Sequence, residues 1–169
     1  GVHCLKYGLT FQNIESLKML TIDGEELLFS REDEGLGLLA LMTGSEGLLG
    51  VITEITVKLT PKPELAKLVM AGFDSVRDCA DAVADIIKNG VIPAGLEMMD
   101  AFAIEAAEDF AKPGYPLDAK ALLLCELDGS TELVNNDVSM VKTLLSKATS
   151  IRVSKTEEER LLLWKGRKS

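Results

Sequence analysis

The chain has 169 residues, of which 47% are hydrophobic and 27% charged, and its formal net charge is -9. This composition is typical of a soluble globular protein with enough apolar side chains to build a core. The negative charge repels phosphate backbones and therefore disfavours nucleic-acid binding. No stretch approaches the roughly 18 apolar residues of a membrane span, and none resembles a signal peptide, so we expect a cytoplasmic protein that does not cross a membrane.

The cysteine and histidine content excludes several kinds of site. Cys4, Cys79 and Cys125 are odd in number and far apart, which argues against a disulfide framework or a metal site and predicts free thiols. His3 is the single histidine, so a Ser-His-Asp or Cys-His arrangement would depend on that one residue. We therefore expect neither a metal site nor a histidine-dependent catalytic arrangement in this chain.

The first part of the chain has the pattern of strands and loops. Residues 1–5 begin inside a predicted strand, and Asp23-Gly24 between two apolar arms predicts a hairpin over residues 16–28. Residues 35–42 are apolar but short, and fit either a helix or an irregular loop. Residues 49–59 alternate and predict a strand. Its expected apolar face consists of Val51, Thr53, Ile55, Val57 and Leu59.

The motif Pro61-Lys62-Pro63 predicts a connector, because prolines at this spacing do not occur in a helix interior or a central strand. Beyond it, strands and helices alternate, and Ser75, Asp100 and Thr156 are predicted helix N-caps. Strands are expected over residues 67–73, 96–99, 121–127 and 151–153, and helices over residues 75–90, 100–110, 131–147 and from 156 onward. Two βαβ units side by side predict a ferredoxin-like α+β layer, an antiparallel sheet with helices on one face.

A glycine-rich run, residues 43–50 (TGSEGLLG), leads directly into the strand that starts at Val51. Glycines allow a backbone to approach a ligand closely. The run matches neither of the common nucleotide motifs and precedes a strand instead of a helix. From the residues alone, a plain glycine-rich turn is favoured over a cofactor loop.

Residues 44–54 (GSEGLLGVITE) and 57–63 (VKLTPKP) resemble the FAD-linked oxidases of the vanillyl-alcohol-oxidase, or PCMH, type. Residues 1–10 (GVHCLKYGLT) are similar to the strand that follows an Ala-Gly-Gly turn in that family. The later segments 93–100 (PAGLEMMD) and 124–129 (LCELDG) resemble its glycolate oxidase branch, which contains flavin subunits. The resemblance spans the whole chain.

The resemblance implies an internal piece of an FAD-dependent oxidoreductase that oxidises a small D-2-hydroxy acid, glycolate or D-lactate, to the 2-oxo acid. Residues 1–63 would be the C-terminal part of the PCMH-type FAD-binding domain, and residues 64–169 a cap or substrate domain, truncated at its C-terminus. An iron-sulfur subunit is the implied electron acceptor. The family's pyrophosphate loop and its histidine-bearing segment do not occur here, so we expect the isolated segment to bind FAD weakly and to be inactive.

The resemblance also implies roles for individual residues. The residues expected to contact FAD are Gly1, Gly44, Ser45, Glu46, Gly47, Gly50, Val51 and Ile52. Arg167 matches an arginine that holds the substrate carboxylate in related D-2-hydroxy-acid dehydrogenases, and a guanidinium suits that task. The alternative is that Arg167 faces water near a helix C-terminus and interacts with the helix dipole.

Four acidic residues lie near strand ends, Glu97, Asp100, Glu126 and Asp128, and paired carboxylates of this kind can serve as acid-base groups or bind a hard metal ion. Helix capping and solvated strand ends are the favoured interpretation, and the pair Met98-Met99 is expected to be core.

Two other functions are compatible with the sequence. Residues from Lys67 onward could form a ferredoxin-like assembly module that docks a partner subunit. A nucleotide-binding enzyme complete in itself is disfavoured, because the chain has no phosphate motif and only the terminal histidine.

Overall fold

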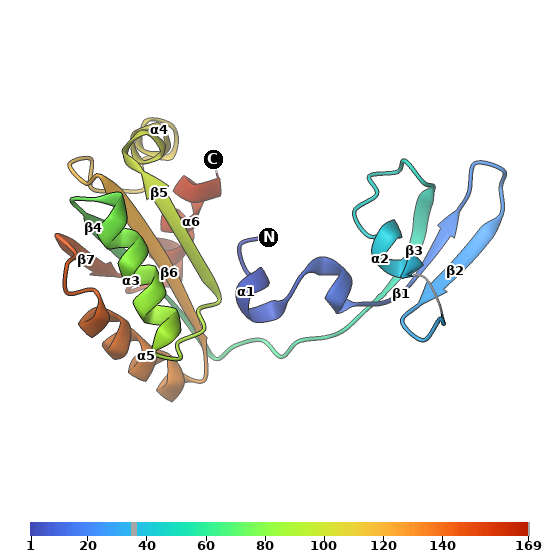
Figure 1. The fold of residues 1–169 in the computed structure, drawn as a ribbon, viewed down its shortest axis with the longest axis horizontal. Helices are drawn as coiled ribbons and strands as arrows, with labels where there is room; N and C mark the ends of the chain where they lie inside the picture. The colour runs from blue at the N-terminus through green and yellow to red at the C-terminus, as the bar shows by residue number, and fades with distance from the viewer. Residues whose placement is uncertain (35–36, 169) are drawn as a thin grey trace. The chain divides into compact units, whose positions relative to one another are not determined.

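The computed structural model describes residues 1–34 and 37–168, and in it the chain divides into two units. The first unit contains Gly1 and residues 8–61, and the second contains residues 2–7 together with the chain from Lys62 onward. Figure 1 shows the helices and strands of each unit. None of the described helices is long and apolar enough to span a membrane.

A three-stranded antiparallel sheet forms the first unit, in the order β2-β1-β3. The strands are β1 (Ile14–Leu20), β2 (Glu26–Ser30) and β3 (Val51–Val57). The predicted hairpin around Asp23-Gly24 is confirmed, since β1 pairs with β2 and Gly24 has a φ of 81° in the turn. The short helix α2 (Leu38–Met42) covers one face, and its Leu39 and Met42 join the core of this unit. Gly35 and Leu36, at the start of the segment expected to be a helix or loop, lie outside the described residues.

The alternation predicted for the strand after the glycine-rich run is wrong in one respect. β3 pairs Glu54 with Lys18 and Ile52 with Met19, so the register shifts at Thr53. A β-bulge adds one residue to a strand and reverses the faces of the residues beyond it. Val51 therefore lies on the face of Glu54, opposite to the face of Ile55. The expected single apolar stripe from Val51 to Leu59 does not form.

The strand predicted at the start of the chain is also absent. Residues Cys4–Tyr7 form the single helical turn α1, closed by a hydrogen bond from the Tyr7 N–H to the His3 carbonyl of 3.0 Å. A 3-10 helix, η1 (Thr10–Asn13), follows in the first unit. The α1 turn brings Lys6 and Tyr7 together onto one carboxylate of the second unit, Asp128, which an extended strand could not do because successive side chains alternate.

The second unit contains a four-stranded antiparallel sheet in the order β5-β6-β4-β7. Its strands are β4 (Leu65–Phe73), β5 (Gly95–Asp100), β6 (Ala121–Gly129) and β7 (Ser150–Val153). Helix α3 (Val76–Lys88) connects β4 to β5, and α5 (Thr131–Leu144) connects β6 to β7. This is the predicted ferredoxin-like arrangement of two βαβ units, with each element within a few residues of its expected bounds.

Helices cover both faces of this sheet, whereas the sequence predicted helices on one face only. Residues of α3 and α5 pack on one side, and residues of α4 (Ala101–Ala111) and α6 (Glu157–Lys168) on the other (Figure 1). The physical reason lies in β6, where all eight residues from Ala121 to Asp128 are buried. A strand apolar on both sides needs a layer on each face, and the inserted helix α4 and the last helix α6 provide the second one.

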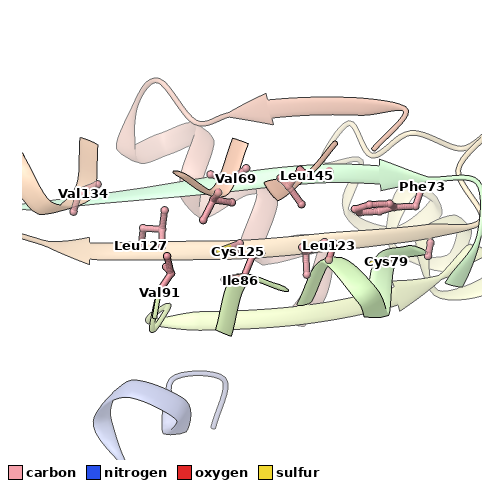
Figure 2. Close-up of a cluster of buried hydrophobic side chains, with 14 residues drawn as sticks. Val69, Phe73, Cys79, Ile86, Val91, Leu123, Cys125, Leu127, Val134 and Leu145 are labelled. Atoms are coloured by element: carbon pink, nitrogen blue, oxygen red, sulfur yellow. The ribbon is translucent and has the colours of Figure 1, made fainter. Parts of the chain in front are cut away.

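The side chains of β6 alternate between two apolar cores. Leu123, Cys125 and Leu127 face α3 and α5, in the cluster drawn in Figure 2. Leu122 and Leu124 face α4 and α6. Strict alternation then places Glu126 and Asp128 on the α4 and α6 side. The same side of β5 carries Glu97, because Glu97 pairs directly with Leu124.

The predicted helix caps are present. The Ser75 hydroxyl accepts from the Asp78 N–H at 3.0 Å, the Asp100 carboxylate from the Ala103 N–H at 2.9 Å, and the Thr156 hydroxyl from the Glu159 N–H at 3.2 Å. Each satisfies one backbone donor that a helix start would otherwise leave unpaired.

The cysteines provide a test of this fold by thiol labelling. Cys79 and Cys125 are buried and Cys4 is exposed, as free thiols. Burial raises the pKa of Cys79 to about 11 and that of Cys125 to about 12, from an ordinary value of 9.0. We expect a thiol-reactive dye to modify one cysteine per folded chain at mildly alkaline pH, and all three in concentrated denaturant.

The same burial predicts a pH dependence. A thiol whose pKa is raised on folding stabilises the folded state fully below its unfolded pKa, and this stabilisation is lost as the pH rises toward the folded value. Denaturation midpoints followed between pH 8 and 11 should therefore fall at the alkaline end. Rapid labelling of all three thiols in the native chain would contradict the buried placement of Cys79 and Cys125.

Candidate functional site

The glycine-rich loop of the first unit connects α2 to β3 with several left-handed backbone conformations. Gly44 and Gly47 have φ angles of 81° and 80°, and Glu46 has a φ of 55°. A Cβ added at Gly44 or Gly47 would meet no heavy atom within 4 Å. At these two positions the backbone is open to close approach, as the expectation of a ligand-contacting loop requires.

Gly50 has a different role from the other two glycines. Its φ is 154°, and an added Cβ would lie 2.7 Å from Met19 Sδ and 2.8 Å from the Leu20 carbonyl oxygen. The space beside Gly50 is therefore filled by β1 of its own unit. Glycine is needed here so that β3 can start against β1, a structural requirement that is independent of any contact with a cofactor.

Arg167 lies in the last turn of α6, in the other unit. Its Nε donates to the Glu97 Oε2 at 2.9 Å, and both side chains are partly exposed. The adjacent Gly166 lets this end of the helix pack closely, because an added Cβ would lie 2.6 Å from Pro113 Cγ and 2.7 Å from the Tyr115 hydroxyl. Tyr115 in turn donates its hydroxyl hydrogen to the Leu163 carbonyl.

A pocket of about 390 Å³ opens beside Arg167. The other residues that line it are apolar: Met98, Met99, Ala103, Ala106, Ala107 and Gly166. Met99 is buried and belongs to the core, as expected, whereas Met98 is 38% exposed. One cation in the wall of an otherwise apolar pocket is an arrangement that suits an organic anion.

Glu126 lies at the centre of a buried polar cluster. It is 4% exposed, and its carboxylate accepts from the Trp164 indole N–H and, at 2.5 Å, from Arg160 Nη1. His3 Nε2 lies 3.6 Å from the same carboxylate. Gly95, paired with Glu126 on β5, makes room for the indole, since an added Cβ would lie 2.9 Å from Trp164 Cζ2.

Asp128 holds the α1 turn against the sheet. Its carboxylate accepts from Lys6 Nζ and, at 2.5 Å, from the Tyr7 hydroxyl. Burial, followed by the hydrogen bond to Asp128, raises the pKa of Tyr7 to about 12. Tyr7 is therefore a phenol at all ordinary pH values and acts as a hydrogen-bond donor to this carboxylate.

The interpretation of the acidic residues as caps and solvated strand ends is correct only for Asp100. Glu126 and Asp128 are buried, and Glu97 pairs with Arg167. All three lie on the sheet face below α6 and α1, and each faces a cation: Glu97 faces Arg167, Glu126 faces Arg160, and Asp128 faces Lys6. The sequence signal was present, since Glu126 interrupts an otherwise apolar strand and must find partners when buried.

Within the described part of the chain, no group of three or more His, Cys, Asp or Glu side chains could hold a metal ion. The residues expected at the FAD site, from Gly44 to Ile52, lie in the first unit together with Gly1, and Arg167 lies in the second.

Similar sequences occur in curated proteins. The chain is 53% identical over its whole length to "Glycolate oxidase subunit GlcD" of Escherichia coli strain K12, and 38% identical to the protein of that name in Bacillus subtilis. It is 28% identical over 99% of its length to "D-lactate dehydrogenase [cytochrome] 1, mitochondrial" of Saccharomyces cerevisiae. The chain spans 35%, 37% and 30% of the lengths of these three proteins.

A solved structure of alkyldihydroxyacetonephosphate synthase has the same fold over 99% of this chain and 34% of its own, with a TM-score of 0.69 and 20% sequence identity. Residues 62–169 match the family described as "FAD linked oxidases, C-terminal domain", so they include every element of the four-stranded sheet and its four main helices. The chain therefore belongs to the C-terminal domain family of the FAD-linked oxidases.

Proposed function

We propose that this chain is part of an FAD-dependent oxidoreductase that oxidises a small D-2-hydroxy acid, glycolate or D-lactate, to the 2-oxo acid. The relatives named glycolate oxidase and D-lactate dehydrogenase support the substrate class, and the match to the FAD linked oxidases supports the cofactor. The observation that carries the proposal on this chain is that Arg167 lines an otherwise apolar pocket. A guanidinium binds a carboxylate through two parallel hydrogen bonds, and the pocket has room for a small hydroxy acid beside this group.

We assign FAD to the first unit, which together with residues up to Pro63 would be the C-terminal part of a PCMH-type binding domain. The open left-handed glycines Gly44 and Gly47 fit a loop that lies against the cofactor. The other assigned contacts are Gly1, Ser45, Glu46, Val51, Ile52 and the backbone of Gly50. When bound, FAD would supply the acceptor for the hydride that leaves the α-carbon of the substrate.

The second unit, residues 64–169, would act as the substrate domain. Arg167 would hold the carboxylate and so fix the orientation of the α-carbon, while the pocket walls exclude water from that end of the substrate. We further propose a cytoplasmic enzyme that passes its electrons to an iron-sulfur subunit.

Arg167 variants of the complete enzyme test this proposal. We expect Arg167→Met to raise the KM for the hydroxy acid about a hundredfold, because a charge-assisted bidentate pair is lost. Arg167→Lys should raise KM about tenfold, since an ammonium keeps the charge but not the planar pair of donors. Steady-state kinetics with glycolate and D-lactate give both values.

A docking role for the second unit predicts a different outcome. Association with a partner subunit would then weaken in Arg167→Met while KM stays unchanged, and the substrate assignment would be wrong. Lys165→Met is the matched control, because Lys165 precedes Arg167 by two residues on α6 and is absent from the pocket wall. Its KM should remain at the wild-type value.

A further inference from the structure

The ion pair between Arg167 and Glu97 uses only one edge of the guanidinium. Glu97 accepts from Nε, at 2.9 Å, and among residues 1–34 and 37–168 it is the only carboxylate within ion-pairing distance of Arg167. An arginine presents five N–H donors, four of which are on the two terminal nitrogens. Because Glu97 occupies the Nε position, the pair of terminal nitrogens is the part of the group left to bind an anion in the two-point manner.

The backbone fixes the position of Glu97 more firmly than that of Arg167. Glu97 lies within the edge strand β5, where it pairs with Leu124 of β6, and its side chain is 21% exposed. Arg167 lies at the end of a helix, and its side chain is 40% exposed. A long side chain at a helix end has many rotamers, and a fixed hydrogen-bond acceptor reduces that number before substrate arrives.

We propose that Glu97 is the positioning residue for Arg167, and that its carboxylate orients the guanidinium so that both terminal nitrogens face the pocket. This inference rests on the proposed function of Arg167 as the carboxylate-binding residue. Glu97 itself does not touch the substrate.

Glu97 also has an opposing electrostatic effect. In the proposed arrangement, Glu97 lies at the Nε side of the guanidinium and the substrate carboxylate at its two terminal nitrogens. Both groups are negatively charged, so they repel each other. Orientation and charge therefore act in opposite directions on substrate affinity. Two substitutions separate them, since Glu97→Gln keeps an oxygen that can accept from Nε but removes the charge, and Glu97→Ala removes both.

The two variants should differ in KM in the complete enzyme. We expect Glu97→Ala to raise the KM for the hydroxy acid about tenfold, the loss typical of one hydrogen bond to a charged group. Glu97→Gln should bind substrate as tightly as wild type or more tightly, because the acceptor remains and the repulsion is gone. Calorimetric titration with oxalate, an anion that is not oxidised, should show the same order of affinities without turnover.

Two further variants show whether Glu97 acts through Arg167. In an Arg167→Met background, Glu97→Ala should have no additional effect on KM or on oxalate affinity. Glu159→Ala is the matched control, because Glu159 accepts from Arg152 Nε at 2.7 Å in a similar pair that does not line the pocket. Its KM should stay at the wild-type value.

The possible failures are distinguishable. If Arg167→Met leaves KM and oxalate affinity unchanged, the proposed function of Arg167 fails. If Arg167→Met weakens binding but Glu97→Ala does not, the positioning role is overturned and the function of Arg167 stands. The positioning role is also overturned if Glu97→Ala still raises KM in the Arg167→Met background. It is overturned as well if Glu97→Gln raises KM as much as Glu97→Ala does.

Discussion

Replacing Glu126 by alanine is expected to lower the free energy of unfolding of the second unit by about 3 kcal/mol. The substitution removes the acceptor of both the Trp164 indole N–H and Arg160 Nη1, in a place where Glu126 is only 4% exposed. Breaking one partner of a buried pair costs about 3–5 kcal/mol, because the remaining charge is left without compensation. The lower value applies here because Arg160 keeps its ion pair with Glu157.

Trp164 is the single tryptophan of the chain, so its fluorescence in a urea titration reports on this unit directly. Glu105→Ala is the matched control, because Glu105 is exposed on α4, and its effect should stay within about 0.5 kcal/mol. Equal midpoints for Glu126→Ala and Glu105→Ala would mean that the buried cluster around Glu126 contributes nothing to stability.

Phe73→Ala should destabilise the second unit by about 3–5 kcal/mol. Phe73 ends β4 with 0% exposure and packs in the cluster between the sheet, α3 and α5 (Figure 2). The smaller side chain loses the transfer free energy of the ring and leaves a cavity that the surrounding β-strands and helices can fill only in part. The same urea titration, followed by circular dichroism and Trp164 fluorescence, measures the change.

Phe102→Ala is the matched control, because it makes the same substitution at an exposed position. Phe102 is 82% exposed on α4, so its truncation should change the free energy of unfolding by no more than about 0.5 kcal/mol. A similar loss for both variants would contradict the assignment of Phe73 to the core. A larger loss for Phe102 would indicate that the exposed face of α4 is covered in solution.

Local patterns in the sequence determined most of the second unit. Caps at Ser75, Asp100 and Thr156 fix where three helices begin, because each offers an oxygen to a specific backbone N–H. The continuous apolar run of residues 121–127 predicted the strand β6, although not that both of its faces are covered. Such features depend on residues a few positions apart, and they can therefore be predicted from the sequence alone.

Contacts between residues far apart in the sequence decided the structural features that the sequence left open or predicted wrongly. The bulge at Thr53 depends on how β3 pairs with β1, and the need for glycine at position 50 depends on Met19. The helical turn of α1 forms where Asp128, more than a hundred residues away, receives Lys6 and Tyr7. No periodicity within residues 1–10 contains that information.

The candidate site divides in the same way. The sequence by itself proposed Arg167 and the glycines at 44 and 47 as candidates, through the family resemblance. Only the tertiary structure decided that Glu97 meets Arg167 and that small side chains of α4 and α6 form a pocket beside it. The reason is that an ion pair between a strand and a helix 70 residues apart exists only after the sheet has formed and α6 has packed on it.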